Sequence, residues 1–164
     1  MGYAVAALLA MFVAAPPALA GDNLLSPEHG ARLIKRTSED PRAPAANLIA
    51  PGAAAGWRSG DGTVPQEIIF QLAAATRFNT LVFTTAGDAP ADEWPREVEV
   101  YTADPFPTMG GWRLVGRASL TRDAGEQTVT APAAEGRFIR LLILSTQRQG
   151  VPRIALGHFE VFMR

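Results

Sequence analysis

The chain has 164 residues, of which 48% are hydrophobic and 19% are charged, and its formal net charge at pH 7 is −1. This length and composition predict a single folded domain with a substantial core, and they exclude a disordered chain. The near-neutral charge provides no basic field, so we expect no nucleic-acid partner, and the lack of cysteine excludes disulfides, thiolate zinc ligands and a cysteine nucleophile.

The first 20 residues predict a signal peptide. They carry no charged side chain, are apolar over residues 3–15, and continue through Pro16-Pro17 to Ala18-Leu19-Ala20, an A-x-A cleavage site. We therefore expect a mature chain that starts at Gly21 and is secreted or periplasmic. The start of the segment lacks Lys and Arg, which leaves an uncleaved anchor helix as the alternative, although the apolar run is short for a bilayer.

The first half of the mature chain alternates short apolar segments with polar loops. A strand is expected at 31–36, and the segment 37–44, rich in proline and charge, indicates an exposed loop. A short buried piece at 46–49 precedes the glycine-rich loop 56–64. Prolines and glycines between these segments are typical of turns.

The clearest strand follows Pro65. Ile68, Phe70 and Leu72 point to one side, and the intervening residues point to the other, which is the period-two pattern of a strand with one face on a core. Pro65 is compatible with the first position of a strand because that residue need not donate a hydrogen bond to the ladder. A second core strand is expected at 78–84.

The second half of the chain supplies further short strands and turns. A long acidic loop is expected at 87–95, and strands are expected at 97–102, 112–116, 127–130, 137–144 and 155–162. The nearly continuous apolar run 137–144 indicates a strand in the middle of a sheet. Because no convincing amphipathic helix is present, the sequence predicts an all-β sandwich or barrel.

Seven pieces of the chain, by their order and spacing, resemble one known family. They are Asn47-Leu48-Ile49, Gly56-Trp57-Arg58-Ser59, and the segments 66–72, 97–101, 111–112, 137–141 and 157–161. Together they resemble the discoidin, or coagulation factor 5/8 type C, family over residues 23–164. The resemblance implies an eight-stranded, mostly antiparallel jelly-roll β-sandwich of the galactose-binding-like fold, which recognises carbohydrate, cell-surface or lipid-headgroup ligands without catalysis.

The resemblance also implies that binding loops gather at one end of the sandwich. By position these loops are 37–46, 51–65, 84–95 and 145–153. Many members have an acidic residue after the Asn-Leu-Ile piece, where it helps to bind a structural calcium, but this chain has Ala50-Pro51-Gly52 there. Only Glu160 matches an acidic position of the family, and calcium prefers several oxygen ligands. We therefore expect no cofactor, with a structural calcium as the alternative.

Sugar binding combines an apolar face with charged or amide side chains that bond to hydroxyl groups. The expected loops contain both kinds of residue. Trp57 and Trp94 are the candidate platforms, and the candidate polar partners are Arg42, Arg58, Asp61, Asp92, Gln147, Arg148 and Arg153. The structural alternative is that Trp57 closes the core and that the polar side chains are merely solvated.

The sequence gives little support for catalysis. Ser59 lacks the glycine spacing of a nucleophile elbow, and Glu97 and Glu99 share one strand face, whereas glycosidase acids face each other across a cleft. His29 and His158 lie far apart in the chain. We therefore predict an exported, non-catalytic module that binds carbohydrate or another cell-surface ligand. The alternative is a structural or protein-interaction module with a partner in the cell envelope.

Overall fold

The computed structural model describes residues 21–53 and 55–164, so the predicted signal peptide lies outside the described residues. These residues form eight strands and three short 3₁₀ helices: β1 (Arg32–Arg36), β2 (Trp57–Arg58), β3 (Gln66–Thr84), β4 (Glu97–Ala103), β5 (Arg113–Ser119), β6 (Glu126–Ile143), β7 (Ala155–Leu156), β8 (His158–Phe162), η1 (Pro27–His29), η2 (Ala45–Leu48) and η3 (Ala91–Glu93). Every strand pair is antiparallel. The predicted all-β antiparallel sandwich is confirmed.

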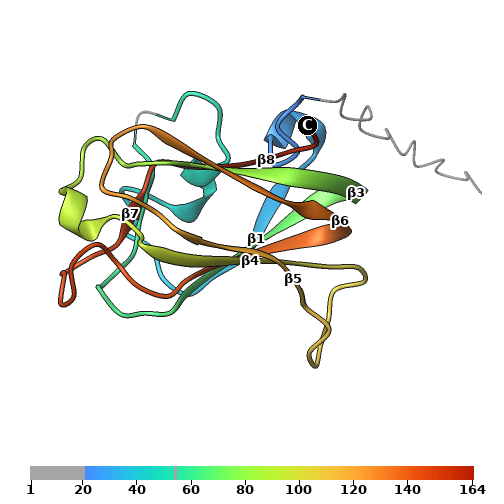
Figure 1. Cartoon of the computed structure of the whole chain (residues 1–164). Coiled ribbons are helices and arrows are strands. Elements are labelled where there is room, and N and C mark those ends of the chain that lie inside the picture. The colour runs from blue at the N-terminus through green and yellow to red at the C-terminus, as the bar shows by residue number, and fades with distance from the viewer. Residues whose placement is uncertain (1–20, 54) are drawn as a thin grey trace, which may run out of the picture.

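Two long strands connect the layers of the sandwich (Figure 1). The first half of β3 pairs with the second half of β6, and both lie in a sheet of order β1-β3-β6-β4-β5. Beyond a register shift between Gln71 and Thr76, β3 continues to residues 80–84, which pair with β8 on one side and with the start of β6 on the other. The strands expected separately at 68–72 and 78–84 are therefore one strand, because Ala73-Ala74-Ala75 between them form no turn.

The core confirms the alternation seen in the sequence. Ile68 and Phe70 are fully buried and Leu72 is 3% exposed. Phe159 on β8 lies between rings from both layers, with its centroid 5.0 Å from that of Phe83 and 6.1 Å from that of Phe70. Burial of such aromatic side chains is the main stabilising contribution available to a chain without disulfides.

The expected terminal strand 155–162 is divided at Gly157. The Gly157 amide donates to the Thr84 carbonyl at 2.8 Å, and a Cβ at this position would lie 2.6 Å from the Thr85 carbonyl oxygen. The chain therefore changes its pairing partner at Gly157. Before it, β7 pairs with β2, and after it, β8 pairs with β3. This short β2-β7 pair lies at the loop end of the sandwich and supports the site described below.

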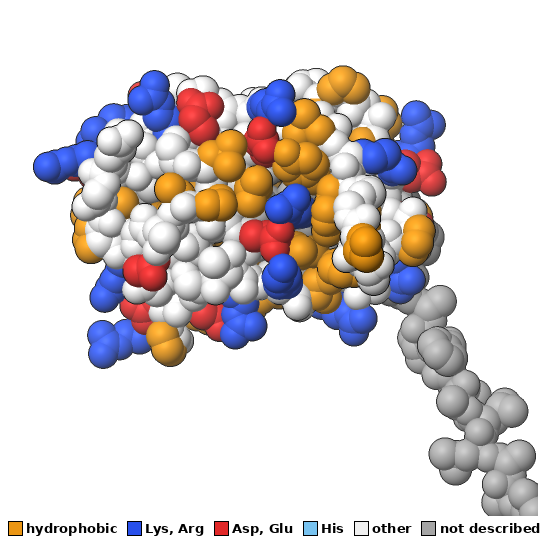
Figure 2. Space-filling model, turned by 90° about the horizontal axis from the view of Figure 1, so that it is seen from below, with side chains coloured by type: hydrophobic (Ala, Val, Ile, Leu, Met, Phe, Trp, Pro, Cys, Tyr) orange, Lys and Arg blue, Asp and Glu red, His pale blue; other side chains and the backbone are white. Residues whose placement is uncertain are grey.

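The outer face of the larger sheet carries a row of paired charges among apolar side chains. Lys35 and Arg140 contact the two carboxylate oxygens of Glu67, at 2.7 and 2.6 Å respectively. The Arg140 guanidinium carbon also lies 5.3 Å from the ring centroid of Tyr101 and 5.7 Å from that of Trp112. Figure 2, seen from the side on which β4 and β5 lie in Figure 1, shows apolar surface interspersed with Lys, Arg, Asp and Glu.

We expect the Glu67→Gln variant to lose stability at pH 7. Burial raises the pKa of the Glu67 carboxyl, but the hydrogen bonds and charges of Lys35 and Arg140 outweigh burial and hold it below its ordinary value of 4.5. A lowered native pKa contributes stability above the unfolded-state pKa, and that contribution disappears as the pH falls through the native value.

Urea denaturation should therefore separate wild type from Glu67→Gln at pH 7, and the difference should shrink as the pH falls below 4.5 through the lowered native pKa of Glu67. Glu97→Gln is the control, because the Glu97 side chain is 48% exposed and lies 3.7 Å from Arg96. A difference between wild type and Glu67→Gln that persists unchanged in acid would refute this account of the Glu67 charge.

Among the described residues, no helix has both the length and the apolar character required to cross a bilayer.

Candidate functional site

All four predicted loops lie at one end of the sandwich, where hydrogen bonds and ion pairs join them (Figure 1). Loop 37–46 runs beside β2, since the Asp40 amide donates to the Arg58 carbonyl at 2.8 Å and the Arg58 amide donates to the Ala43 carbonyl at 3.0 Å. The Arg58 side chain reaches Asp88 in loop 84–95, with an Nη2–Oδ2 distance of 2.9 Å. The loop end is therefore a continuous surface built from distant parts of the chain.

The two tryptophans predicted as ligand platforms are buried, and that prediction is wrong. Trp57 is 0% exposed and its Nε1–H donates to the Ser38 carbonyl at 3.1 Å. Trp94 is 7% exposed, donates from Nε1 to the Ala86 carbonyl at 3.0 Å, and packs with Ala155. Each indole fills the space beneath a loop and satisfies its own N–H, so neither ring face is available to a sugar.

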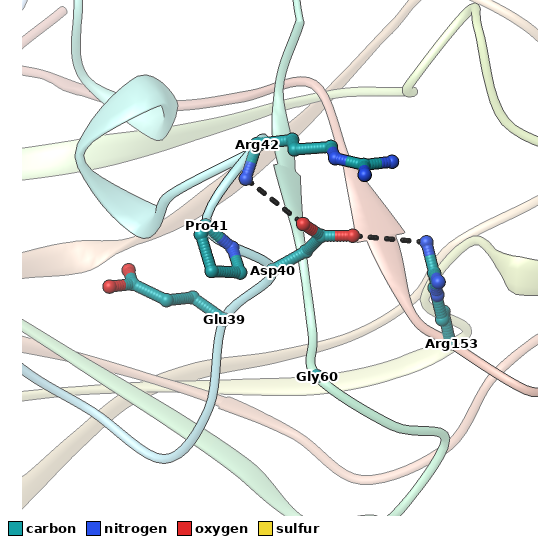
Figure 3. A pocket seen from close by; sticks show the side chains of 6 residues that line it. All are labelled: Glu39, Asp40, Pro41, Arg42, Gly60 and Arg153. Carbon is teal, nitrogen blue, oxygen red and sulfur yellow. Dashed lines mark hydrogen bonds and ion pairs between the residues drawn. The ribbon is translucent and has the colours of Figure 1, made fainter.

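A first pocket of about 410 Å³ opens at this end and contains two of the predicted residues. Its lining consists of Glu39, Asp40, Pro41, Arg42, Gly60 and Arg153. Figure 3 shows the Asp40 carboxylate between the backbone amide of Arg42 and the guanidinium group of Arg153, while the Arg42 side chain runs above it in the view. One carboxylate oxygen accepts a hydrogen bond from the Arg42 amide at 2.9 Å, and the other lies 3.0 Å from Arg153 Nη1.

The charged side chains of this pocket differ in their exposure and in whether they already have a partner. The Asp40 side chain is 17% exposed and the Arg153 side chain is 46% exposed. The Arg42 side chain is exposed, and among the described residues its guanidinium makes no ion pair. Glu39 points away from Asp40 (Figure 3), since Arg36 and the Ala45 amide occupy its two oxygens. Arg42 and the Asp40–Arg153 pair therefore supply the donors and acceptors available to a ligand.

The hydrogen bond from the Ala45 amide, assisted by Arg36, lowers the pKa of Glu39 against the opposing effect of burial. Glu39 is therefore ionised at neutral pH and anchors the loop that carries Asp40. It shapes the pocket without offering a free oxygen to it.

A second pocket of about 290 Å³ contains Asp92 and Arg148, which were both predicted as ligand partners. Arg148 Nη1 lies 3.3 Å from one Asp92 oxygen, and Arg122 Nη2 lies 2.7 Å from the other. Hydrogen bonds from Arg148 and then from Arg122 lower the pKa of Asp92. The Asp92 carboxylate is therefore ionised at neutral pH and accepts hydrogen bonds.

A sequence model of the F5/8 type C domain matches residues 34–156, which is most of the chain. The chain belongs to the F5/8 type C family. A comparison with curated proteins gave no match.

Solved structures with the same fold have low sequence identity to this F5/8 type C domain. CpGH89CBM32-5 from Clostridium perfringens, in complex with GalNAc-β-1,3-galactose, is 16% identical with a TM-score of 0.68, over 86% of this chain and 99% of that chain. The family 32 CBM from C. perfringens NanJ, in complex with galactose, is 18% identical with a TM-score of 0.64, over 80% of this chain and 92% of that chain. Chitosan-binding module 1 from the chitosanase/glucanase of Paenibacillus sp. IK-5 is 18% identical with a TM-score of 0.66, over 86% and 98% of the two chains.

Other predicted site residues of the F5/8 type C domain have structural roles. Gln147 donates from Nε2 to the carbonyls of Pro95 at 3.0 Å and Leu120 at 2.8 Å, so its amide holds two loops together. Asp61 accepts hydrogen bonds from the hydroxyl and the amide of Thr63, and these bonds lower its pKa. Neither residue lines the two pockets described above.

Asp40 is the site residue that the sequence analysis missed. It lies in the predicted loop 37–46, and an acidic residue directly before a proline is a common turn element that gives no functional signal. Its position beside Arg42 and Arg153 depends on the pairing of β2 with β7. The Asp40–Arg153 bond joins residues that are 113 positions apart in the chain.

The residues near the family's calcium position line a separate pocket. A pocket of about 340 Å³ is lined by the Ala50-Pro51-Gly52 segment, Glu126, His158 and Glu160. Burial and then the charge of Glu126 raise the pKa of Glu160. Within residues 21–53 and 55–164, no group of three or more His, Asp or Glu side chains could hold a metal ion.

The candidate catalytic residues also have structural roles. Ser59 is 0% exposed, and its hydroxyl donates to the Asp61 carbonyl and accepts from the Ile154 amide. Glu97 and Glu99 lie on the outer sheet face, where they contact Ser119 and Arg117 respectively. These contacts fix loops and strands and do not converge on one cavity.

Proposed function

We propose that this F5/8 type C domain is an exported, non-catalytic module that binds carbohydrate in the first pocket. The observation that carries the proposal is the convergence of Asp40, Arg42 and Arg153 in one cavity at the loop end. A sugar hydroxyl both donates and accepts hydrogen bonds, so a carboxylate paired with one guanidinium, with the Arg42 guanidinium in the same pocket, is complementary to neighbouring hydroxyls. Pro41 supplies an apolar wall for the C–H surface of the sugar.

The fold neighbours support this choice of ligand class, because two of them were solved with galactose or GalNAc-β-1,3-galactose. The leader predicted at residues 1–20 supports export to a secreted or periplasmic location. The domain is proposed to act without a cofactor, so sugar binding should survive addition of EDTA.

The test is titration calorimetry of the mature domain with galactose, N-acetylgalactosamine and GalNAc-β-1,3-galactose. Loss of a hydrogen bond to a charged group costs about 1.5–3 kcal/mol, so we expect Asp40→Ala to weaken sugar binding roughly 10- to 100-fold. Asp61→Ala is the matched control, because Asp61 is an exposed loop aspartate outside both pockets. Equal affinities for wild type and Asp40→Ala would contradict the proposed site.

A protein-interaction module is the second candidate. It is favoured by apolar side chains on and around the β4–β5 hairpin, where Phe106 is 41% exposed, Met109 95% and Leu114 43%. Exposed apolar patches often mark protein contacts. No binding across a broad glycan array, combined with capture of an envelope protein that Met109→Ser abolishes, would favour this candidate.

A further inference from the structure

The second pocket contains an Asp–Arg ion pair and proline side chains, as the first pocket does. In the first, the Asp40–Arg153 ion pair lies beside Pro41. In the second, the Asp92–Arg148 ion pair lies beside Pro90 and Pro152. Each pocket therefore offers a carboxylate, a guanidinium donor and an apolar proline wall, which are the groups the first pocket is proposed to use for a sugar.

The two pockets share one loop. Pro152 lines the second pocket and the next residue, Arg153, lines the first. The loop that carries Pro152 and Arg153 packs against the glycine-rich loop. Gly62 lies so close to Val151 that a Cβ on Gly62 would be 1.8 Å from the Val151 carbonyl oxygen. A ligand that extends from the first pocket past Arg153 and Pro152 would reach the lining of the second.

The second pocket also keeps binding capacity beyond its internal ion pair. The Arg148 side chain is 73% exposed, and Asp92 already has a second guanidinium partner, Arg122, at 2.7 Å. Arg148 can therefore turn from Asp92 to a ligand while Asp92 remains paired. A purely structural ion pair needs no adjoining cavity, whereas this pair borders one of about 290 Å³.

We infer that the second pocket is a subsite for a second sugar unit, and that the domain therefore prefers an oligosaccharide of two or more units to a monosaccharide. The inference rests on the proposed function, because it takes the first pocket as the primary site. Beyond that function, the inference states that the ligand has at least two sugar units, and it assigns Arg148, Asp92 and Pro152 to the second unit.

The test compares two affinities for each protein by titration calorimetry, one for galactose and one for GalNAc-β-1,3-galactose. Wild type should bind the disaccharide at least about tenfold more tightly. In Arg148→Ala the ratio of the two affinities should fall towards one. Arg96→Ala is the matched control, because the Arg96 side chain is 58% exposed and pairs with Glu97 outside both pockets, so the ratio should stay at the wild-type value.

The outcomes separate this inference from the proposed function. Equal binding of galactose and the disaccharide to wild type, or an unchanged ratio in Arg148→Ala, would overturn the second subsite and leave the first pocket intact. Absence of binding to either sugar and across a glycan array would overturn both. Thermal melting of Arg148→Ala at the wild-type temperature checks that the variant is folded.

Discussion

Trp57→Ala is expected to destabilise the domain by about 3–5 kcal/mol, because the substitution removes a fully buried indole and leaves a cavity. The Trp57 side chain is part of the main core cluster, and its N–H holds loop 37–46 through the Ser38 carbonyl. The effect should appear in chemical denaturation without any ligand present. The side chain that sequence reasoning placed at the ligand surface is thus expected to act on stability.

Trp57→Phe is the matched variant, because it keeps an aromatic ring in the core and removes the indole N–H. It should be less destabilising than Trp57→Ala, with a loss of about 1–3 kcal/mol from the unsatisfied Ser38 carbonyl and the smaller ring. A loss below about 1 kcal/mol for Trp57→Ala would contradict the burial of this side chain and would restore it as a candidate platform.

Gly62→Ala is expected to cost about 1–3 kcal/mol of stability and to weaken sugar binding, because an added Cβ would meet backbone atoms. The Cβ would lie 1.8 Å from the carbonyl oxygen of Val151 and 2.9 Å from its carbonyl carbon. One of the two loops must move apart from the other. Arg153, two residues beyond Val151, would then be displaced from Asp40.

Gly87→Ala controls for this substitution in another loop at the same end of the domain. A Cβ at Gly87 would have no atom within 4 Å, so the change should be neutral or stabilise slightly by limiting the unfolded chain. Thermal melting and sugar titration of both variants measure the two effects. A Gly62→Ala protein as stable as Gly87→Ala would show that loops 56–65 and 145–153 are not packed as described.

The architecture was predictable because the core strands are either alternating or nearly continuous apolar segments separated by turns rich in Gly and Pro. Ile68, Phe70 and Leu72 are buried together, and the apolar run 137–144 is central as expected, since β6 pairs with both β3 and β4. The long strands were not predictable as single units. Local sequence shows where apolar pieces lie, but whether β3 bends or stops between them depends on its partners β6 and β8.

The site was predictable only in part, for a physical reason. Arg42 and Arg153 were identified because exposed charges in gathered loops can be recognised from composition and order, and both line the first pocket. Trp57 and Trp94 were placed wrongly because a lone aromatic in a glycine-rich or acidic loop shows the same sequence pattern whether or not the loop folds over it. Asp40 was missed because an aspartate before a proline is a common turn element, and its contact with Arg153 joins residues 113 positions apart.

The outer sheet face gives the clearest competing location for a ligand. Its charges already have partners, as in the Lys35–Glu67–Arg140 group, and one side of the Tyr101 and Trp112 rings faces Arg140. In the first pocket, by contrast, the Arg42 guanidinium is exposed and forms no ion pair with any described residue. Sugar hydroxyls are therefore expected to find their hydrogen-bond partners at the loop end.

Titration of the ¹⁵N-labelled domain with GalNAc-β-1,3-galactose, followed by amide chemical shifts, tests the loop-end site most directly. The account predicts that the largest shifts occur at Glu39, Asp40, Arg42, Gly60 and Arg153, with smaller shifts at residues 148–151, and that Asp40→Ala needs roughly 10- to 100-fold more sugar to reach the same shifts. Shifts concentrated on the outer sheet face or the β4–β5 hairpin, or no shift with any sugar tested, would contradict it.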